Sequence, residues 1–115
     1  MNFPELALHD AHLIALEHDT GQRRLRLRLR RMDGSLLQLE FVGVEDMNLF
    51  PFDLQNILFE IARYSASDEG TLEFCHELGY SPHFVEEIMA GRLTLFHLDP
   101  SVGMGGHILA QDMLV

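Results

Sequence analysis

Histidine supplies most of the side chains in this sequence that titrate near neutral pH, with seven among 115 residues. Two of them, His9 and His12, flank Asp10. Imidazole and carboxylate groups bind zinc and other divalent ions. On a strand the two histidines would point to opposite faces, so they could share one ion only from a turn. The segment favours a turn role for Asp10, and a metal-dependent enzyme that uses His9, Asp10 and His12 is the alternative.

The other reactive side chains form no catalytic pattern in the sequence. His76, His83, His97 and His107 are dispersed, and only the fold could bring them together. Cys75 stands beside His76, but neighbours on a strand face opposite ways, so we expect a small apolar cysteine in the sheet. We therefore expect no cofactor and no catalytic residues, and we favour a protein that is not an enzyme.

Arginines alternate with leucines between positions 23 and 31, which places Arg26, Arg28 and Arg30 together on one face of a strand. Such a row is either a small-anion site or one half of a set of ion pairs across the sheet. Glu17 and Glu40 fall on neighbouring predicted strands, and the pattern favours pairing with them.

Net charge is −10, with eighteen acidic residues, eight arginines and no lysine. Six of the arginines lie at 23–31, so the rest of the chain is strongly acidic. An acidic surface repels phosphate backbones and suits a basic protein partner, and we expect no nucleic acid as a partner. The carboxylates expected in exposed turns and at a helix start are the candidate contacts. They are Glu45, Asp46, Asp68, Glu69, Glu86 and Glu87.

Residues 12–43 predict a three-stranded antiparallel meander with one apolar and one charged face. A three-residue loop, Met32-Asp33-Gly34, sets apolar residues opposite one another. The expected pairs are Leu29–Leu37, Leu27–Leu39, Leu25–Phe41, Arg28–Gln38 and Arg26–Glu40. A turn centred on Thr20-Gly21 extends the meander upstream, with the expected pairs Leu16–Leu25, Ile14–Leu27 and Glu17–Arg24.

The remainder of the chain predicts further strands and one short helix. Residues 53–65 fit either a helix or a strand at 57–64, while 71–76 and 93–98 alternate as strands do. Ser81-Pro82 begins a short helix near 82–90. We expect the glycines near 103–106 to form a mobile loop, followed by a strand or short helix. The fold class is therefore α+β, mostly antiparallel β. Met47, Phe50, Phe52 and Phe59 are either core residues or an exposed apolar patch for a partner.

Three short motifs follow one another in the first half of the chain: His9-Asp10-Ala11, Phe41-Val42-Gly43-Val44 and Gln55-Asn56-Ile57. In this order they resemble a group of small bacterial domains, some of which look like immunity proteins of toxin systems. The resemblance covers about residues 8–65. It implies a compact, sheet-rich fold with residues 57–64 as a strand, and it brings no catalytic residues.

These features together predict a single domain spanning residues 1–115. No apolar run is long enough for a membrane span, and the lone Cys75 favours a reducing cytoplasm. The leading hypothesis is a bacterial, cytoplasmic, immunity-type protein that binds a basic partner protein. The metal-dependent enzyme and the small-anion binder are the alternatives, and the sequence leaves the oligomeric state open.

Overall fold

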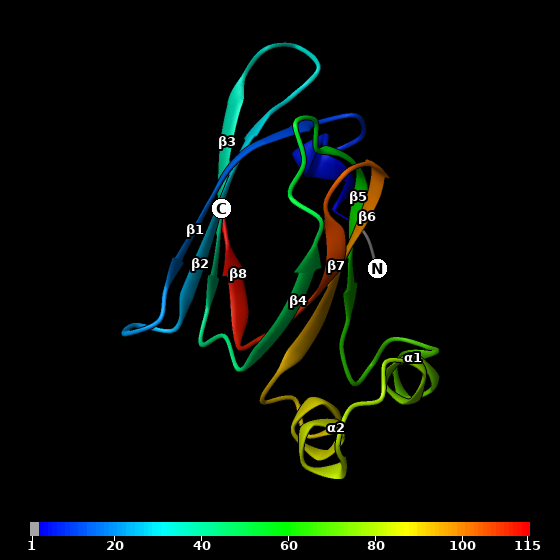
Figure 1. The fold of residues 1–115 in the computed structure, drawn as a ribbon. Helices are drawn as coiled ribbons and strands as arrows, with labels where there is room; N and C mark the ends of the chain where they lie inside the picture. The colour runs from blue at the N-terminus through cyan, green and yellow to red at the C-terminus, as the bar shows by residue number, and fades with distance from the viewer. Residues whose placement is uncertain (1–2) are drawn as a thin grey trace.

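The computed structural model describes residues 3–115, and within them one eight-stranded sheet folds over into two layers (Figure 1). Strands β1, β2, β3 and β8 form one layer, and β4, β7, β6 and β5 form the other. The first layer comprises β1 (His12–Asp19), β2 (Arg24–Arg30), β3 (Leu36–Val42) and β8 (Asp112–Leu114). The second comprises β4 (Asp46–Phe50), β5 (Ile57–Tyr64), β6 (Thr94–Val102) and β7 (Gly105–Ala110). The antiparallel, sheet-rich fold expected from the sequence is confirmed.

The predicted hairpin between β2 and β3 is confirmed in its register. Leu27 pairs with Leu39, and Arg26 with Glu40, as expected for the three-residue loop. Gly34 has a φ of 85°, which suits the end of that loop. The leucines of β2 are fully buried and the arginines face outward, because successive side chains of a strand point to opposite faces.

The predicted register between β1 and β2 is wrong by two residues. Leu16 pairs with Leu27 and Glu17 with Arg26, rather than with Leu25 and Arg24. The loop between the strands is longer than the predicted turn, since Arg23 adopts a φ of 56° and lies in it. A bulge between Leu13 and Ala15 also shifts the ladder.

Apolar side chains from both layers meet in one core. Phe41 of β3 packs edge-on against Phe96 of β6, with ring centroids 5.1 Å apart. The N-terminal 3-10 turn η1 (Pro4–Leu6) adds Leu6 to this core. Burial of these side chains is the main force that holds the two layers together.

Two helices cover the outer face of the second layer at its lower end (Figure 1). Helix α2 (Pro82–Met89) confirms the helix predicted near 82–90, and the Ser81 hydroxyl accepts a hydrogen bond from the backbone N–H of Phe84. The strand predicted at 71–76 is wrong, because these residues form helix α1 (Thr71–Glu77). Cys75 is therefore buried on a helix rather than in the sheet, and His76 is exposed.

Residues 103–106 are not the loose loop that the glycines predict. A Cβ on Gly106 would lie 1.9 Å from the backbone oxygen of Asn48, and one on Gly103 would lie 2.2 Å from that of Gln55. Both glycines have positive φ, at 136° and 77°. They allow β7 and the turn before it to approach neighbouring backbone more closely than any other residue could.

Strand β5 settles the ambiguity at 53–65 in favour of the strand that the resemblance implies. The end of the chain is also strand, since β7 is followed directly by β8, which pairs with β3. No helix in residues 3–115 has the length and apolar character needed to cross a membrane.

Candidate functional site

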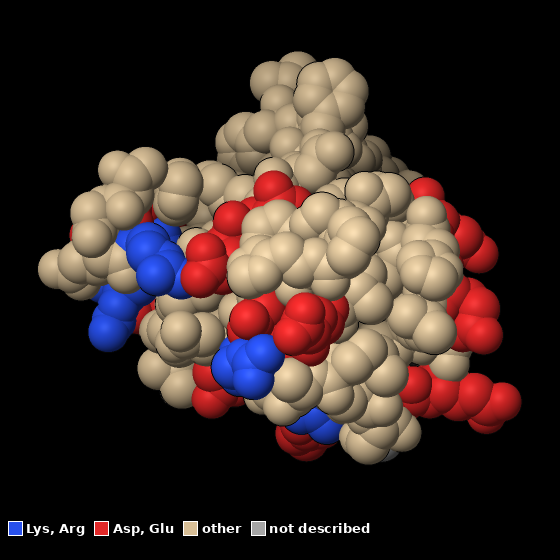
Figure 2. All heavy atoms as spheres, turned by 90° about the horizontal axis from the view of Figure 1, so that it is seen from below, with Lys and Arg blue, Asp and Glu red and all other residues tan. Residues whose placement is uncertain are grey.

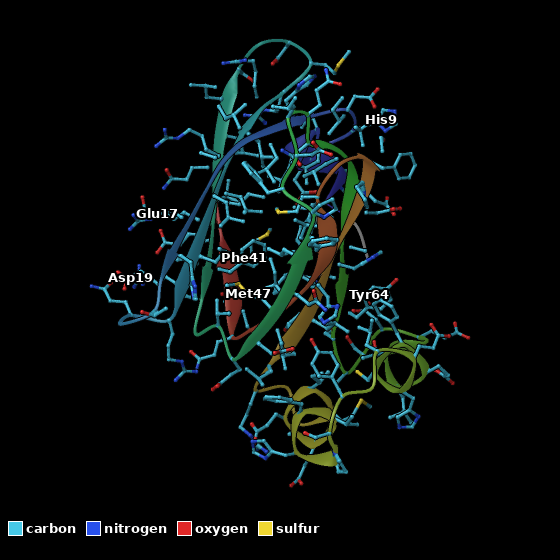
Figure 3. The ribbon with its side chains drawn as sticks, viewed as in Figure 1. His9, Glu17, Asp19, Phe41, Met47 and Tyr64 are labelled. Atoms are coloured by element: carbon cyan, nitrogen blue, oxygen red, sulfur yellow. The ribbon has the colours of Figure 1, made fainter. Side chains whose placement is uncertain are left out.

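An apolar groove of about 700 Å³ lies between β1 and β4, on the side where the two layers part. This volume falls in the range of about 300–1,000 Å³ that ligand sites occupy. None of its lining residues carries a charge. They are Ile14, Ala15, Leu16, Met47, Asn48, Leu49, Phe52 and Met104. Figure 3 shows Met47 between the two layers, with Glu17 and Asp19 on the far part of β1.

The groove exists because the two layers are joined along only part of β1. Strand β1 pairs with β5 through one residue pair, His12 with Ile57, while its remaining length pairs with β2. Strand β4 ends the order of the sheet and pairs with β7. Both strands therefore present an edge to the groove, and no other strand formed by residues 3–115 pairs with either edge there.

The opposite seam between the layers is filled by the chain itself. Phe3 stacks on Phe96 of β6 at 6.5 Å and lines the same hollow as Met113 of β8. The guanidinium of Arg63 lies 5.5 Å from the centre of the Phe3 ring. Phe3 thus fills the space between the layers on that side. Within residues 3–115, no corresponding side chain fills the space between β1 and β4.

The apolar residues that the sequence singled out divide between core and surface. Met47 packs against the core and lines the groove. Phe50, Phe52 and Phe59 are 78%, 59% and 44% exposed. Phe50 lines a separate hollow on the other face of β4. The exposed apolar surface at the groove is therefore that of Phe52 together with Ile14 and Leu16. Contiguous exposed apolar surface of this kind marks sites of interaction.

Two of the acidic candidates lie where β4 begins, Glu45 just before the strand and Asp46 at its first position. Glu45 forms an ion pair with Arg23. Asp46 is the first residue of β4 and is half-buried beside Tyr80. The expectation of an exposed turn holds for Glu45, which is exposed and precedes the strand, and is wrong for Asp46, because β4 begins there.

The other four acidic candidates lie just before α1 or within α2, the two helices at the lower end of the molecule (Figure 1). Hydrogen bonds from the backbone N–H and hydroxyl of Ser65 lower the pKa of Asp68. Arg92 donates to Glu87 at 2.6 Å and lowers the pKa of that carboxyl. Glu69 and Glu86 are exposed. Asp68 and Glu87 therefore have structural partners, which leaves Glu69 and Glu86 as the accessible charges of this set.

Ion pairs occupy one end of the arginine row. Arg26 donates to Glu17 at 2.9 Å and to Glu40 at 3.2 Å, and Arg24 also pairs with Glu40. Hydrogen bonds from Arg26 and Arg24 lower the pKa of Glu40. Arg28 lines a shallow hollow beside Arg26, while Arg30 lies further along β2. The pairs of Arg26 neutralise part of the surface on which an anion would need to bind.

His9, Asp10 and His12, the residues of the alternative metal-site hypothesis, lie where β1 begins. Figure 3 shows His9 near the top of the molecule. His9 Nε2 lies 3.4 Å from an oxygen of Asp10, and the His9 ring packs edge-on against Phe59. His12 is the first residue of β1. Within residues 3–115, no three histidine, cysteine or carboxylate side chains are grouped closely enough to hold a metal ion.

A second cluster of titratable groups, absent from the candidates above, lies between the sheet and the helices. His97 and His107 are directly opposite each other on β6 and β7. His107 packs against Tyr80, with centroids 5.4 Å apart, and His97 against Phe74 at 5.5 Å. The sequence does not reveal that His97 and His107 face each other, because their pairing depends on where the turn between β6 and β7 falls.

Burial perturbs this cluster. Burial lowers the pKa of His107, with the charge of Asp46 opposing that effect and His97 adding to it. Burial, followed by the charge of Asp46, raises the pKa of Tyr80. The Tyr80 hydroxyl makes no hydrogen bond of ordinary geometry within residues 3–115, so Asp46 acts on it mainly through charge. Tyr80 packs against both His107 and Phe84 of α2, so the cluster forms a polar layer between the sheet and that helix.

We expect stability to fall as the pH drops below about 6.5, the ordinary pKa of histidine. Because the folded state holds His107 at a lowered pKa, the unfolded chain binds the proton first. His107→Gln should flatten the dependence of the unfolding free energy on pH in this window. Urea titrations at several pH values measure it, with exposed His83→Gln as the control. Equal slopes for wild type and His107→Gln would contradict the assignment.

No protein-family model matches this chain, and neither the curated proteins nor the solved structures give a match. The resemblance to immunity-type domains stays a prediction from the sequence.

Proposed function

We propose that this domain acts by binding another protein, and that the groove between β1 and β4 is its contact surface. The observation that carries the proposal is an uncharged groove lined by the partly exposed apolar side chains of Ile14, Leu16 and Phe52. Apolar pockets bordered by polar surface are where binding energy concentrates in protein interfaces. An immunity-type role, in which the domain covers a toxic partner, is consistent with this arrangement and with the resemblance of the first half.

The partner that fits this surface is basic. The chain carries a net charge of −10, and Arg23, Arg24, Arg26 and Arg92 already pair with its own carboxylates. Figure 2 shows acidic side chains spread across the lower face, with basic ones gathered in a few places. Complementary charge of this kind speeds association and excludes acidic competitors.

A carboxylate placed in the groove should weaken partner binding while the fold survives. Leu16 is 37% exposed, so Leu16→Asp keeps its charge in contact with water yet opposes an apolar surface. We expect binding to weaken at least about tenfold, equivalent to ~1.4 kcal/mol. The experiment captures partners from the native host with wild type and variant, and then measures affinity for the recovered protein.

The matched control is Leu36→Asp, the same substitution at a residue of β3 that is 60% exposed and outside the groove. It should bind like wild type. Equal capture by all three proteins would show that the groove is not the contact surface. If wild type recovers no protein at near-stoichiometric yield, the proposal that this domain binds another protein is wrong.

Association with the captured partner should be fast and should slow steeply as salt is added. Raising the ionic strength from about 0.01 to 0.15 M shortens the Debye length from about 30 to 8 Å. Stopped-flow measurements should show the change in the association rate, with little change in dissociation. An association rate that does not depend on salt would contradict the proposal that the partner is basic. It would not contradict the proposal that the groove is the contact surface.

A further inference from the structure

The edge of β4 is the part of the groove at which another backbone can bind. Strand β4 is the last strand on one side of the sheet and pairs with β7 through five residue pairs. Edge strands are commonly protected by lysine, proline or a covering segment. Within β4 there is no proline and no basic residue, and its one charge, Asp46, is at the beginning. The N–H and C=O groups of alternate β4 residues therefore remain available for a further strand.

The side chains of β4 define what an added strand would meet. Met47 and Leu49 pack against the core and line the groove, while Phe50 is exposed on the other face. Asn48, at the edge between them, borders both the groove and the hollow on that other face. A strand paired with β4 alternates in the same way, so every second side chain would enter the groove. Because the lining carries no charge, those side chains must be apolar. Across the groove they would meet Leu16.

Carboxylates near both ends of the groove indicate the charge of the segment. Asp19 ends β1, three residues beyond the lining residue Leu16, and Asp53 directly follows the lining residue Phe52. Both are exposed, and neither forms an ion pair with an arginine of residues 3–115. Basic residues flanking an apolar stretch would be close to these charges.

Resting on the proposed function, we infer that the partner contributes an extended segment that adds to β4 as a further strand. The segment spans about the five residues that β4 pairs with β7, has apolar side chains at alternate positions, and carries basic residues at its ends. A small apolar ligand would fill the groove but leave the backbone groups of β4 unpaired. A second copy of this chain would bring another charge of −10 to an acidic surface.

The test uses the acetylated and amidated peptide Arg-Val-Thr-Val-Thr-Val-Arg as the probe, with the full chain. Binding is measured by calorimetry. The matched peptide Arg-Val-Val-Val-Thr-Thr-Arg has the same composition without alternation, and should bind about tenfold more weakly because fewer cross-strand contacts form. A version with glutamates at both ends should lose binding by a similar factor. Leu16→Asp should weaken the first peptide, and Leu36→Asp should not.

Two N-methylated versions identify backbone pairing. One carries methyl groups on the even-numbered amides and the other on the odd-numbered ones. Strand addition predicts that one set abolishes binding and the other leaves it within about threefold, since only alternate amides face β4. Amide exchange by NMR should show slowed exchange at every second residue of β4 when the peptide is bound.

Several outcomes would overturn the inference. These are no peptide binding up to millimolar concentration, equal loss with both methylated versions, or protection of β4 without alternation. Oleate binding in the groove without peptide binding would assign it to a small ligand. Self-association accompanied by alternating β4 protection would assign it to a second copy. The proposed function is judged separately by capture with Leu16→Asp, so it survives if a partner uses the groove without adding a strand.

Discussion

Leu27→Asp should unfold most of this protein under conditions where wild type is fully folded. Leu27 is completely buried and lies between Leu16 of β1 and Leu39 of β3. A carboxylate there would lose its hydration without gaining a hydrogen bond or a counter-ion. The cost of several kcal/mol is comparable with the about 5–15 kcal/mol that stabilise a typical domain. Urea unfolding followed by circular dichroism measures the change.

The control for this substitution is Gln38→Asp on the exposed face of the same hairpin. Gln38 pairs with Arg28, so a new carboxylate there should change stability by no more than about 1 kcal/mol, in the stabilising direction. Leu27→Ala should fall between the two, with a loss of about 2–5 kcal/mol from the cavity it leaves. A melting temperature unaffected by Leu27→Asp would refute the burial of the meander face that carries Leu25, Leu27 and Leu29.

Gly106→Ala should destabilise the protein by about 2–5 kcal/mol, the sum of a strained φ and a steric clash. The new Cβ would meet the backbone oxygen of Asn48, and rigid backbone cannot move aside as a flexible side chain can. Relief requires β4 to separate from β7. Chemical denaturation gives the stability, and binding of the captured partner should fall in the fraction that remains folded.

The comparison that isolates the clash is Gly91→Ala. Gly91 has a φ of 81°, but a Cβ there would meet nothing within 4 Å. It should therefore lose only the cost of the left-handed backbone, about 1–2 kcal/mol. Equal losses for the two variants would mean that β4 does not lie against β7 as closely as described.

Local pattern was enough to predict β2, β3 and α2. The alternation of Leu25 to Arg30 has one consistent pairing with the next strand, and a three-residue loop supplies it. The register of β1 could not be obtained in this way, because neither the longer loop nor the bulge after Leu13 leaves a periodic signal. Its residues alternate equally well in both registers.

The strand predicted at 71–76 shows how two periods can coexist in a short segment. Leu72 and Phe74 alternate with polar residues, which suggested a strand. Thr71, Phe74, Cys75 and Leu78 have helical spacing, and these are the side chains that α1 turns towards the sheet. The segment is too short for its length to distinguish a strand from a helix.

The groove could not be predicted from the sequence because segments that are far apart in the chain form it together. The sequence singles out Phe52 as part of a candidate apolar patch, but it places Ile14 and Leu16 only in the meander. Only the order of the strands in space shows that β1 and β4 face each other across an unfilled seam.

The two-layered core also sets the order in which this protein can be completed during its synthesis. The ribosome releases the apolar face of β2 and β3 early, but Phe96 and Ile108, which cover it, come much later. The 55 residues from position 41 to position 96 take roughly 3–11 s at about 5–20 residues per second. Until β6 and β7 are made, Leu25, Leu27 and Leu29 lack part of the apolar surface that covers them in the folded protein. We therefore expect chaperones that recognise exposed strands to bind the nascent chain.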